Sequence, residues 1–380
     1  MKRLTDICDI QYGYAFDSKC FTEDSSYPQL VRIRDVKRGY SETYYSGDYP
    51  EEYILSEGDL LVGMDGEFNI ARWKCSGALL NQRVCKLTAK VGTNEEYIRL
   101  AMLKSLKEIE QRTAFVTVKH LSAKELNKLE LDIPELTKQD KIADTLSRLE
   151  RVIEARKEEL EKLDELIKAR FVELFGDLAN PKCQWKKEKL VDACKNPDDI
   201  KCGPFGTQLS KDEYCSSGVA VWEIPQINSG FATQPTHFLT DEKANQLEAY
   251  SIKSGDIAMS RKGNVGRCAV FPETMEDGII HSDVLRIRID NDLVLPVFMM
   301  HQLHYSGAVQ HQIELVSSGA IMAGINVTKL KQIEVHIPPL ELQNQFADFV
   351  KQVDKSKVAV QKVLDETQKL FDSLMQQYFG

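Results

Sequence analysis

The stretch from Ile133 to Gly176 reads IPELTKQDKIADTLSRLERVIEARKEELEKLDELIKARFVELFG, and a related stretch occupies residues 337–380. The differences 337 − 133 and 380 − 176 both equal 204, so the two copies align without a gap. A fixed offset of this kind indicates a repeated structural unit. The match includes Pro, Gln, Ala-Asp and Phe-Gly as well as periodic leucines. It therefore favours a true repeat over two unrelated amphipathic helices.

Each copy predicts a long helix with a narrow apolar seam. Apolar residues recur on alternating spacings of four and three, with Glu, Lys and Arg between them, which is typical of a coiled coil. The seam positions are Ile142, Leu146, Leu149, Ile153, Arg156, Leu160, Leu163, Ile167, Arg170 and Leu174 in the first copy, and Phe346, Val350, Val353, Lys357, Val360, Leu364, Thr367, Phe371, Leu374 and Tyr378 in the second.

The ends of both helices carry the expected signals. Prolines at 134 and 338–339 precede them, because proline is excluded from a helix interior. Thr137 with Asp140 resembles a capping box, and Gly176 ends the first helix. A helix of about 35–40 residues is about 50–60 Å long. Two such helices in one chain are expected to pair with each other.

The segments before the two copies repeat a common order of short apolar strands. Gly58-Asp59-Leu60 is echoed by Gly255-Asp256-Ile257, and the offset drifts from 186 at Leu4/Leu190 to 197 at Gly58/Gly255 and then to 204. The loops therefore differ in length. The predicted fold is α+β: two β-rich domains, residues 1–132 and 181–336, are separated by two long antiparallel helices, 133–180 and 337–380. The helices form a coiled coil, and the whole is an internal pseudo-two-fold repeat.

Composition and net charge limit the classes of protein to which the chain can belong. The formal net charge is −9 and the pI about 5.5, which argues against a free-standing protein that coats nucleic acid but leaves room for local basic loops. The nine cysteines include no Cys-x-x-Cys pair and are expected to be reduced. No signal peptide or apolar run of membrane length is present, so a cytoplasmic protein is expected.

No catalytic motif emerges. The chain has no Walker-type loop, no Gly-x-Gly-x-x-Gly and no Asn/Asp-Pro-Pro-Tyr tetrapeptide. Residues 197–201, PDDIK, resemble a nuclease site only superficially, because their carboxylates are contiguous and predict a solvated turn. His301 and His304 lack a zinc-site context, so a surface or core role is the default. We expect no catalysis, metal or cofactor in this chain itself.

Polar and basic residues nevertheless gather on Gly-containing loops of both modules. Arg, Lys, Asn and Gln read base edges, while Lys and Ser hold phosphates. Each residue alone is more often an ordinary surface residue, so the signal is their recurrence on several loops. The candidate DNA-binding residues are Tyr14, Ser18, Lys19, Arg32, Arg34, Lys37, Arg38, Asn69, Arg72, Arg83 and Lys119 in the first module, and Gln208, Gln226, Asn228, Ser260, Arg261, Lys262, Asn264, Arg267, His281 and Ser282 in the second.

The chain resembles, over essentially its whole length, the specificity subunit of type I restriction–modification enzymes. The resemblance is carried by Ile-Pro-x-Leu-x-x-Gln-x-x-[Ile/Phe]-Ala-Asp at 133–144 and 337–348, by the Phe-Gly helix ends and by the Gly-Asp-[Leu/Ile] strands. It implies two target recognition domains, each reading one half of a bipartite, asymmetric DNA site. The two long helices would fix the unread gap between the half-sites.

The resemblance also implies partners. Two methyltransferase (modification) subunits carrying S-adenosylmethionine would dock on the chain and methylate adenine, and restriction subunits with ATP- and Mg-dependent motor activity would join them. The residues expected to serve docking and the spacer are Pro134, Leu136, Gln139, Ala143, Asp144, Pro338, Leu340, Gln343, Ala347 and Asp348. The alternative from another class is a non-enzymatic two-module scaffold that binds protein partners.

Overall fold

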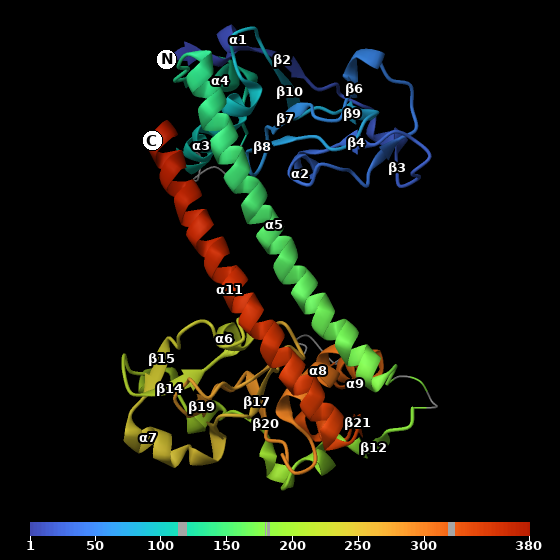
Figure 1. The fold of residues 1–380 in the computed structure, drawn as a ribbon, viewed down its shortest axis with the longest axis vertical. Helices are drawn as coiled ribbons and strands as arrows, with labels where there is room; N and C mark the ends of the chain where they lie inside the picture. The colour runs from blue at the N-terminus through green and yellow to red at the C-terminus, as the bar shows by residue number, and fades with distance from the viewer. Residues whose placement is uncertain (113–119, 179, 181–182, 318–323) are drawn as a thin grey trace. The chain divides into compact units, whose positions relative to one another are not determined.

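The computed structural model describes residues 1–112, 120–178, 180, 183–317 and 324–380. They divide into two compact units: unit 1 is Met1–Lys157 with Lys362–Gly380, and unit 2 is Glu158–Gln361. Each unit thus combines one β-rich module with a segment of each long helix. Figure 1 shows both units as ribbons.

Unit 1 holds eleven of the strands in the described residues, most of them short. Its strands are β1 (Lys2–Arg3), β2 (Cys8–Tyr12), β3 (Phe21–Thr22), β4 (Leu30–Val31), β5 (Tyr44–Tyr45), β6 (Ile54–Leu55), β7 (Leu60–Gly63), β8 (Asn69–Arg72), β9 (Ala78–Leu80), β10 (Val84–Ala89) and β11 (Glu130–Leu131). Its helices are α1 (Leu4–Ile7), α2 (Ile33–Val36), α3 (Glu95–Arg112) and α4 (Ala123–Lys128), with 3-10 turns η1 (Ser18–Cys20) and η2 (Glu51–Tyr53).

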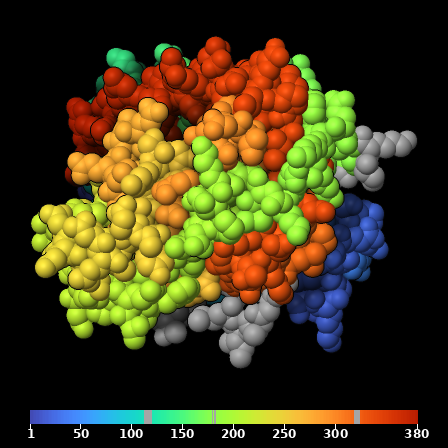
Figure 2. All heavy atoms as spheres, turned by 90° about the horizontal axis from the view of Figure 1, so that it is seen from below, coloured from blue at the N-terminus to red at the C-terminus, as the bar shows by residue number. Residues whose placement is uncertain are grey.

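Unit 2 follows the same plan with longer connections. Its strands are β12 (Lys186–Lys189), β13 (Ile200–Cys202), β14 (Val219–Trp222), β15 (His237–Leu239), β16 (Ser251–Ile252), β17 (Ile257–Ser260), β18 (Cys268–Val270), β19 (Gly278–Ile280), β20 (Val284–Ile287) and β21 (Glu334–Ile337). Its helices are α6 (Ile224–Asn228), α7 (Asp241–Gln246), α8 (Pro296–Tyr305), α9 (Gly307–Ser317) and α10 (Val327–Leu330), and its 3-10 turns are η3 (Leu190–Ala193), η4 (Pro197–Asp199), η5 (Gly206–Gln208), η6 (Lys211–Glu213) and η7 (Glu248–Tyr250). Figure 2 shows the heavy atoms from below, with green, yellow and orange segments of this unit in front.

The strand orders of the two units match. The main sheet is β2-β10-β7-β8 in unit 1 and β13-β20-β17-β18 in unit 2, antiparallel throughout. A second sheet is β4-β9-β6 in unit 1 and β15-β14-β19-β16 in unit 2, and each contains one parallel pair. The pairs β1-β11 and β12-β21 close each module. The predicted internal repeat is therefore confirmed at the level of strand order.

Each main sheet separates two apolar clusters, because successive side chains of a strand point to opposite faces. In β7, Leu60 and Val62 pack with α3 on one face, while Leu61 packs with the second sheet on the other. In β17, Ile257 and Met259 face the helix-rich side and Ala258 the other. Buried on both faces, these strands read as continuous apolar runs.

The long helices α5 (Leu136–Phe175) and α11 (Leu340–Phe379) have 40 residues each. In unit 1, the beginning of α5 shares an apolar cluster with the end of α11, and in unit 2 the end of α5 shares one with the beginning of α11. The helices therefore run antiparallel, as predicted. Every predicted seam position is buried or half-buried.

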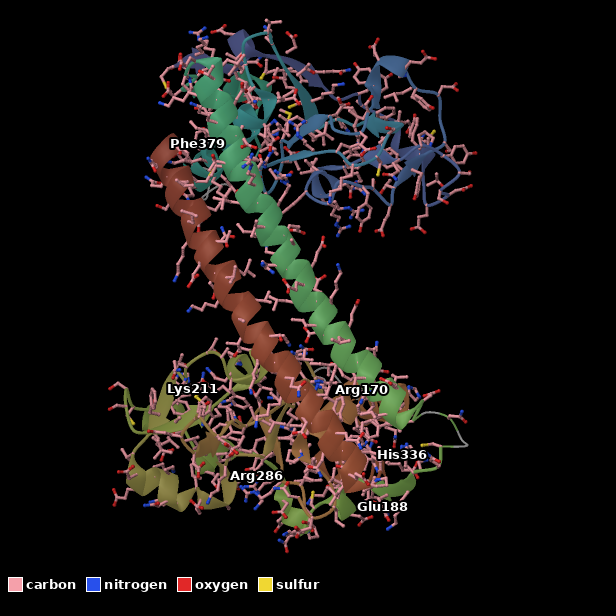
Figure 3. All side chains as sticks on the ribbon, in the orientation of Figure 1. Arg170, Glu188, Lys211, Arg286, His336 and Phe379 are labelled. Atoms are coloured by element: carbon pink, nitrogen blue, oxygen red, sulfur yellow. The ribbon has the colours of Figure 1, made fainter. Side chains whose placement is uncertain are left out.

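The helix ends are anchored by aromatic side chains that the seam did not include. Phe171 and Phe175 of α5 are buried, with ring centroids 5.7 and 4.6 Å from Phe298 of α8. In unit 1, Phe379 of α11, labelled in Figure 3, lies 5.3 Å from the ring of Tyr97. Aromatic pairs at these distances stabilise each module on its own helix segments.

A buried glutamine fixes the start of each long helix. The Gln139 side chain accepts a hydrogen bond from the Asn94 N–H (2.9 Å) and donates to the Pro134 carbonyl (2.8 Å). The Gln343 side chain accepts from the Leu295 N–H (2.7 Å) and donates to the Pro338 carbonyl (2.7 Å). We call these contacts the glutamine clips.

The clips correct one sequence expectation. Gln139 and Gln343 are 1% and 0% exposed, so they hold the helix against the loop before α3 or α8 and cannot dock a partner. The Thr137/Asp140 capping box is also wrong: the helix begins at Leu136, and the Asp140 carboxylate accepts from the Asn94 side chain instead.

The nine cysteines are all free thiols, as predicted. None of the helices in the described ranges is long and apolar enough to cross a bilayer. In the same ranges, no group of three or more His, Cys, Asp or Glu side chains is placed to hold a metal ion.

Candidate nucleic-acid interface

Three loops leave each main sheet at the same end. In unit 1, Tyr12 of β2 pairs with Cys85 of β10, and Gly63 of β7 pairs with Val84 and Asn69. The loops after β2, between β7 and β8, and before β10 therefore emerge together. The loops after β13, between β17 and β18, and before β20 do the same in unit 2. We call these places the sheet ends.

A glycine permits two loops to cross at each sheet end. Gly13 donates its N–H to the Val84 carbonyl at 3.0 Å, and Gly203 donates to the Val284 carbonyl at 3.1 Å. A Cβ at Gly13 would lie 2.0 Å from the Asn81 carbonyl oxygen, and one at Gly203 would lie 2.2 Å from the His281 carbonyl oxygen. Only glycine fits such a close backbone approach.

The first sheet end carries three charged or titratable side chains, which we call the first cluster: Asp65, Arg83 and His120. The Arg83 Nε lies 3.6 Å from an Asp65 carboxylate oxygen, and its Nη1 lies 3.1 Å from the His120 Nδ1. His120 also contacts the Asp65 carboxylate. Arg83 has a φ of 72°, in the left-handed region that side chains rarely adopt.

A strip of cations on α2 and the residues that flank it lies beside this cluster. The strip consists of Arg32, Arg34, Lys37 and Arg38, all exposed. Lys37 forms an ion pair with Glu67 of the β7–β8 loop at 3.1 Å, which places the strip next to the sheet end. Tyr14, from the loop after β2, is 42% exposed and packs its ring 5.1 Å from Phe16. Exposed aromatic and cationic side chains on one module are suited to nucleic acid.

The second sheet end carries the second cluster: Glu223, Lys262, His281 and Asp283. The Lys262 Nζ lies 2.8 Å from an Asp283 carboxylate oxygen, and Glu223 accepts from the His237 ring at 2.7 Å. The Arg261 guanidinium stacks over the exposed Phe205 ring, 4.9 Å from its centroid. Ser282, which stands between His281 and Asp283 in the sequence, is half-buried.

Asn264 and Arg267, farther along the β17–β18 loop, line a separate feature. They border a groove of about 990 Å³ whose other lining residues include His304 of α8 and Asp164 and Lys357 of the long helices, all within unit 2. Burial lowers the pKa of both His301 and His304 to about 4, so their rings are neutral at pH 7. His301 is buried and His304 is half-buried, which agrees with the surface or core role expected of them.

Three predicted DNA-binding residues are placed elsewhere by the structure. Ser260 and Gln226 are 0% and 2% exposed, and the Gln226 amide is used as an internal cap that accepts from the Glu223 N–H. Arg72 lies at the opposite end of its sheet, bound to Glu95 and Glu96 at 2.9 Å each. These three predictions are corrected, because burial or internal ion pairing takes the side chains away from a DNA surface.

The remaining candidates are distributed around the two modules. Ser18 and Lys19 are exposed on η1, Gln208 on η5 and Asn228 at the end of α6. Asn69 is half-buried at the start of β8 and donates to the Glu67 carbonyl. Lys119 lies outside the described residues. The sequence analysis missed Asp283 and Glu223 as site residues, because its search in the second module favoured cations, amides and hydroxyls.

The residues expected to dock partners differ in how exposed they are. Ala143 is buried with the glutamines, and Pro338 is buried too, whereas Pro134, Leu340 and Ala347 are half-buried. Leu136 is 44% exposed, and Asp144 and Asp348 are exposed. Only the outward-facing members of the repeated motif are therefore available to a partner.

The chain thus consists of two modules of one topology, each with a loop-built polar surface at a sheet end and each joined to the long helices. The family model for the type I restriction modification DNA specificity domain matches this chain twice, at residues 1–165 and 185–367. The chain belongs to the type I restriction–modification specificity family.

Named relatives cover most of the chain. The specificity subunit of the type I restriction enzyme EcoBI from Escherichia coli is 27% identical over 402 aligned positions, covering 99% of this chain and 84% of the relative. The MjaVIII specificity subunit from Methanocaldococcus jannaschii is 22% identical, covering 86% and 79%.

Solved structures share the fold. The type I restriction–modification S subunit from M. genitalium has a TM-score of 0.62 at 15% identity, covering 100% of this chain and 95% of that one. A structure that addresses complex assembly and conformational transition of the type I system has a TM-score of 0.52 at 18% identity, covering 100% and 96%. These similarities confirm the predicted two-module architecture.

Proposed function

We propose that this chain is the DNA specificity subunit of a type I restriction–modification complex. Each module reads one half of a bipartite, asymmetric site through its sheet-end loops. The observation that carries the proposal is the repeated sheet end: three loops converge at the same place in both units, on matching strand orders, with different side chains. One scaffold with two different surfaces suits two different half-sites.

Electrostatics supports contact with duplex DNA. The cation strip on α2 and the pair Arg261 and Lys262 supply local positive charge in a chain whose total is −9. Phosphate contacts position a protein on DNA, and base contacts in the grooves give specificity. The acidic total suits a subunit that holds DNA together with partners and does not coat it alone.

The long helices act as the spacer in this proposal. An α-helix rises about 1.5 Å per residue, so its length sets the unread gap in steps. Because both modules belong to one chain, binding of one half-site makes binding of the other half-site an intramolecular step. Docking of modification subunits, two in number, falls to outward positions of the repeated motif such as Leu136 and Asp144, and restriction subunits join through them.

The chain itself is proposed to be non-catalytic and to act in the cytoplasm. Partner subunits supply S-adenosylmethionine, ATP and Mg. The support for a non-catalytic role is the family model, which describes a DNA specificity domain.

The direct test is co-expression with the neighbouring methyltransferase gene, followed by single-molecule sequencing for methylated adenines. The proposal expects a new motif of two short blocks around a fixed unread gap. The methyltransferase expressed alone is the control and should give no such motif. If a purified, stable complex methylates nothing new, the protein-scaffold alternative replaces the proposal.

A further inference from the structure

The two clusters occupy equivalent backbone positions. In unit 1, the Met64 N–H donates to the Arg83 carbonyl, and the Leu121 N–H donates to the Met64 carbonyl. In unit 2, Arg261 takes the place of Met64: its N–H donates to the Asp283 carbonyl, and its carbonyl accepts from the Ile325 N–H. Asp65 is thus the counterpart of Lys262, and Arg83 is the counterpart of Asp283.

The ion pairs at these positions have opposite polarity. The first module has the carboxylate on the β7–β8 loop and the cation before β10, as Asp65–Arg83. The second module has the cation on the β17–β18 loop and the carboxylate before β20, as Lys262–Asp283. A purely structural ion pair has no need to reverse between two copies of one scaffold.

Both pairs are poised to open. The Arg83 and Lys262 side chains are 51% and 40% exposed, whereas the Asp65 and Asp283 side chains are 22% and 27% exposed. Exposed ion pairs contribute little to stability, so the cation can leave its carboxylate at small cost.

The backbone under the first pair is strained. The φ of 72° at Arg83 is held by the loop crossing at Gly13, whose N–H reaches the Val84 carbonyl. Strain of this kind persists where the surrounding structure fixes it and is concentrated at functional sites. The Arg83 side chain on this backbone is 51% exposed.

The chemistry of the pair matches one base pair. A cation donates to guanine O6 and N7, and a carboxylate accepts from the cytosine N4 amino group, both in the major groove. We propose that each ion pair opens on DNA and reads one G·C base pair, with the cation on guanine and the carboxylate on cytosine. This inference rests on the proposed function and adds the residues and the base pair.

The reversed polarity then has a consequence. In the frame of its own module, the guanine contacted by Lys262 lies on the strand opposite to the guanine contacted by Arg83. The base pair is the same, and its orientation is inverted. A charge exchange within one module should therefore invert the base pair that this module selects.

The experiment uses the complete complex with its modification subunits. Arg83→Gln should relax one G·C position of the first half-site, lowering discrimination there by about 10- to 100-fold, and leave the second half-site unchanged. Lys262→Met should do the same to the second half-site only. Lys90→Gln is the matched control, since Lys90 pairs with Asp9 at the other end of the first sheet.

A second variant tests polarity. The double variant Asp65→Lys/Arg83→Asp should exchange G for C at the same position of the first half-site. If a variant complex no longer methylates, competition binding with duplexes changed one base pair at a time gives the same readout. The inference is supported if changing one particular G·C pair weakens binding of the wild-type complex but no longer weakens binding of the variant complex.

Two results would overturn it. In the first, Arg83→Gln weakens binding equally at all sequences, which makes the pair a phosphate contact. In the second, the motif stays unchanged at every position of the first half-site. Either result leaves a bipartite wild-type motif, and with it the proposed function, intact. Absence of a bipartite wild-type motif is the separate failure of the proposed function.

Discussion

The first and second modules share their scaffold and differ at the surfaces built on it. Gly13 and Gly203 permit the same loop crossing, and Gln139 and Gln343 form the same clip. The same cap also precedes α2 and α6: the Arg32 N–H donates to Asp35, and the Glu223 N–H donates to Gln226. Backbone geometry has been retained where two segments must meet.

Charge, in contrast, has been redistributed. The first module places its cations on and beside α2 and acidic residues on the β7–β8 loop. The second places Glu223 before α6 and cations on the β17–β18 loop. Hydrogen bonds between backbone atoms tolerate such changes, because they do not depend on the side chains. The comparison indicates that recognition surfaces can vary without disturbing the fold beneath them.

The largest effect is expected at the loop crossings. Gly203→Ala would bring a Cβ to 2.2 Å from the His281 carbonyl oxygen, so the two loops must separate. We expect a loss of stability of more than about 4 kcal/mol in unit 2, seen as insolubility or a low Tm. Gly307→Ala, with open space around its Cβ, should behave as wild type. A soluble Gly203→Ala protein of normal Tm would show that the crossing is not obligatory.

The glutamine clips come next. Gln343→Ala leaves the part-buried Leu295 N–H and the buried Pro338 carbonyl without their side-chain partner, which should destabilise unit 2 by about 2–4 kcal/mol. Hydrogen exchange of α8 and the start of α11 measures the effect within the folded chain. Gln345→Ala, at an exposed position of the same helix, is the control. Equal hydrogen-exchange rates in the Gln343→Ala and Gln345→Ala variants would contradict a stabilising role for the clip.

Acid should affect unit 2 more than unit 1. The pKa values of His301 and His304 are lowered to about 4 by burial, against an ordinary value of 6.5. Between these values the unfolded state binds more protons, so stability falls as the pH drops from about 6.5 to about 4. We expect unit 2 to lose about 1–3 kcal/mol between pH 7 and pH 5, measured by hydrogen exchange.

A variant separates this cause from general acid sensitivity. His304→Gln keeps an acceptor for the Cys268 N–H but does not titrate, so it should flatten the pH dependence. His311→Gln, at a side chain that is 70% exposed, should leave it unchanged. If units 1 and 2 lost the same stability at low pH, the two histidines would not be the cause.

The smallest effect concerns the cation strip. The double variant Arg34→Gln/Lys37→Gln should lower DNA affinity of the complex roughly 10-fold and reduce the slope of log K against log salt by about 2. The change should be the same for all sequences, because phosphates carry no base identity. Lys107→Gln on α3 is the control. A sequence-dependent loss would instead make the strip part of base readout.

Much of the fold was predictable because it depends on local pattern. The seam of α5 and α11 follows from residue spacing, and strands such as β7 follow from short apolar runs between Gly and Asp. The internal sequence repeat predicted two modules, each followed by a long helix, without any assignment of individual strands. Such features depend on residues close together in the sequence.

The site was less predictable because it depends on distant partners. Arg72 looked like a loop cation, but it lies in β8 and is bound by Glu95 and Glu96 at the start of α3. Gln139 and Gln343 looked like docking residues because they recur, yet both point inward. The counterpart relation of Asp65 to Lys262 is hidden from sequence, since the β7–β8 and β17–β18 loops differ in length and composition.

The most direct test of the account is a module exchange. Residues 1–132 are replaced by the equivalent module of another family member, and the methylated motif of the hybrid complex is mapped by single-molecule sequencing. The account predicts that one half-site changes while the other half-site and the gap length stay as in wild type. A change in both half-sites, or in neither, would contradict two independent readers on one scaffold.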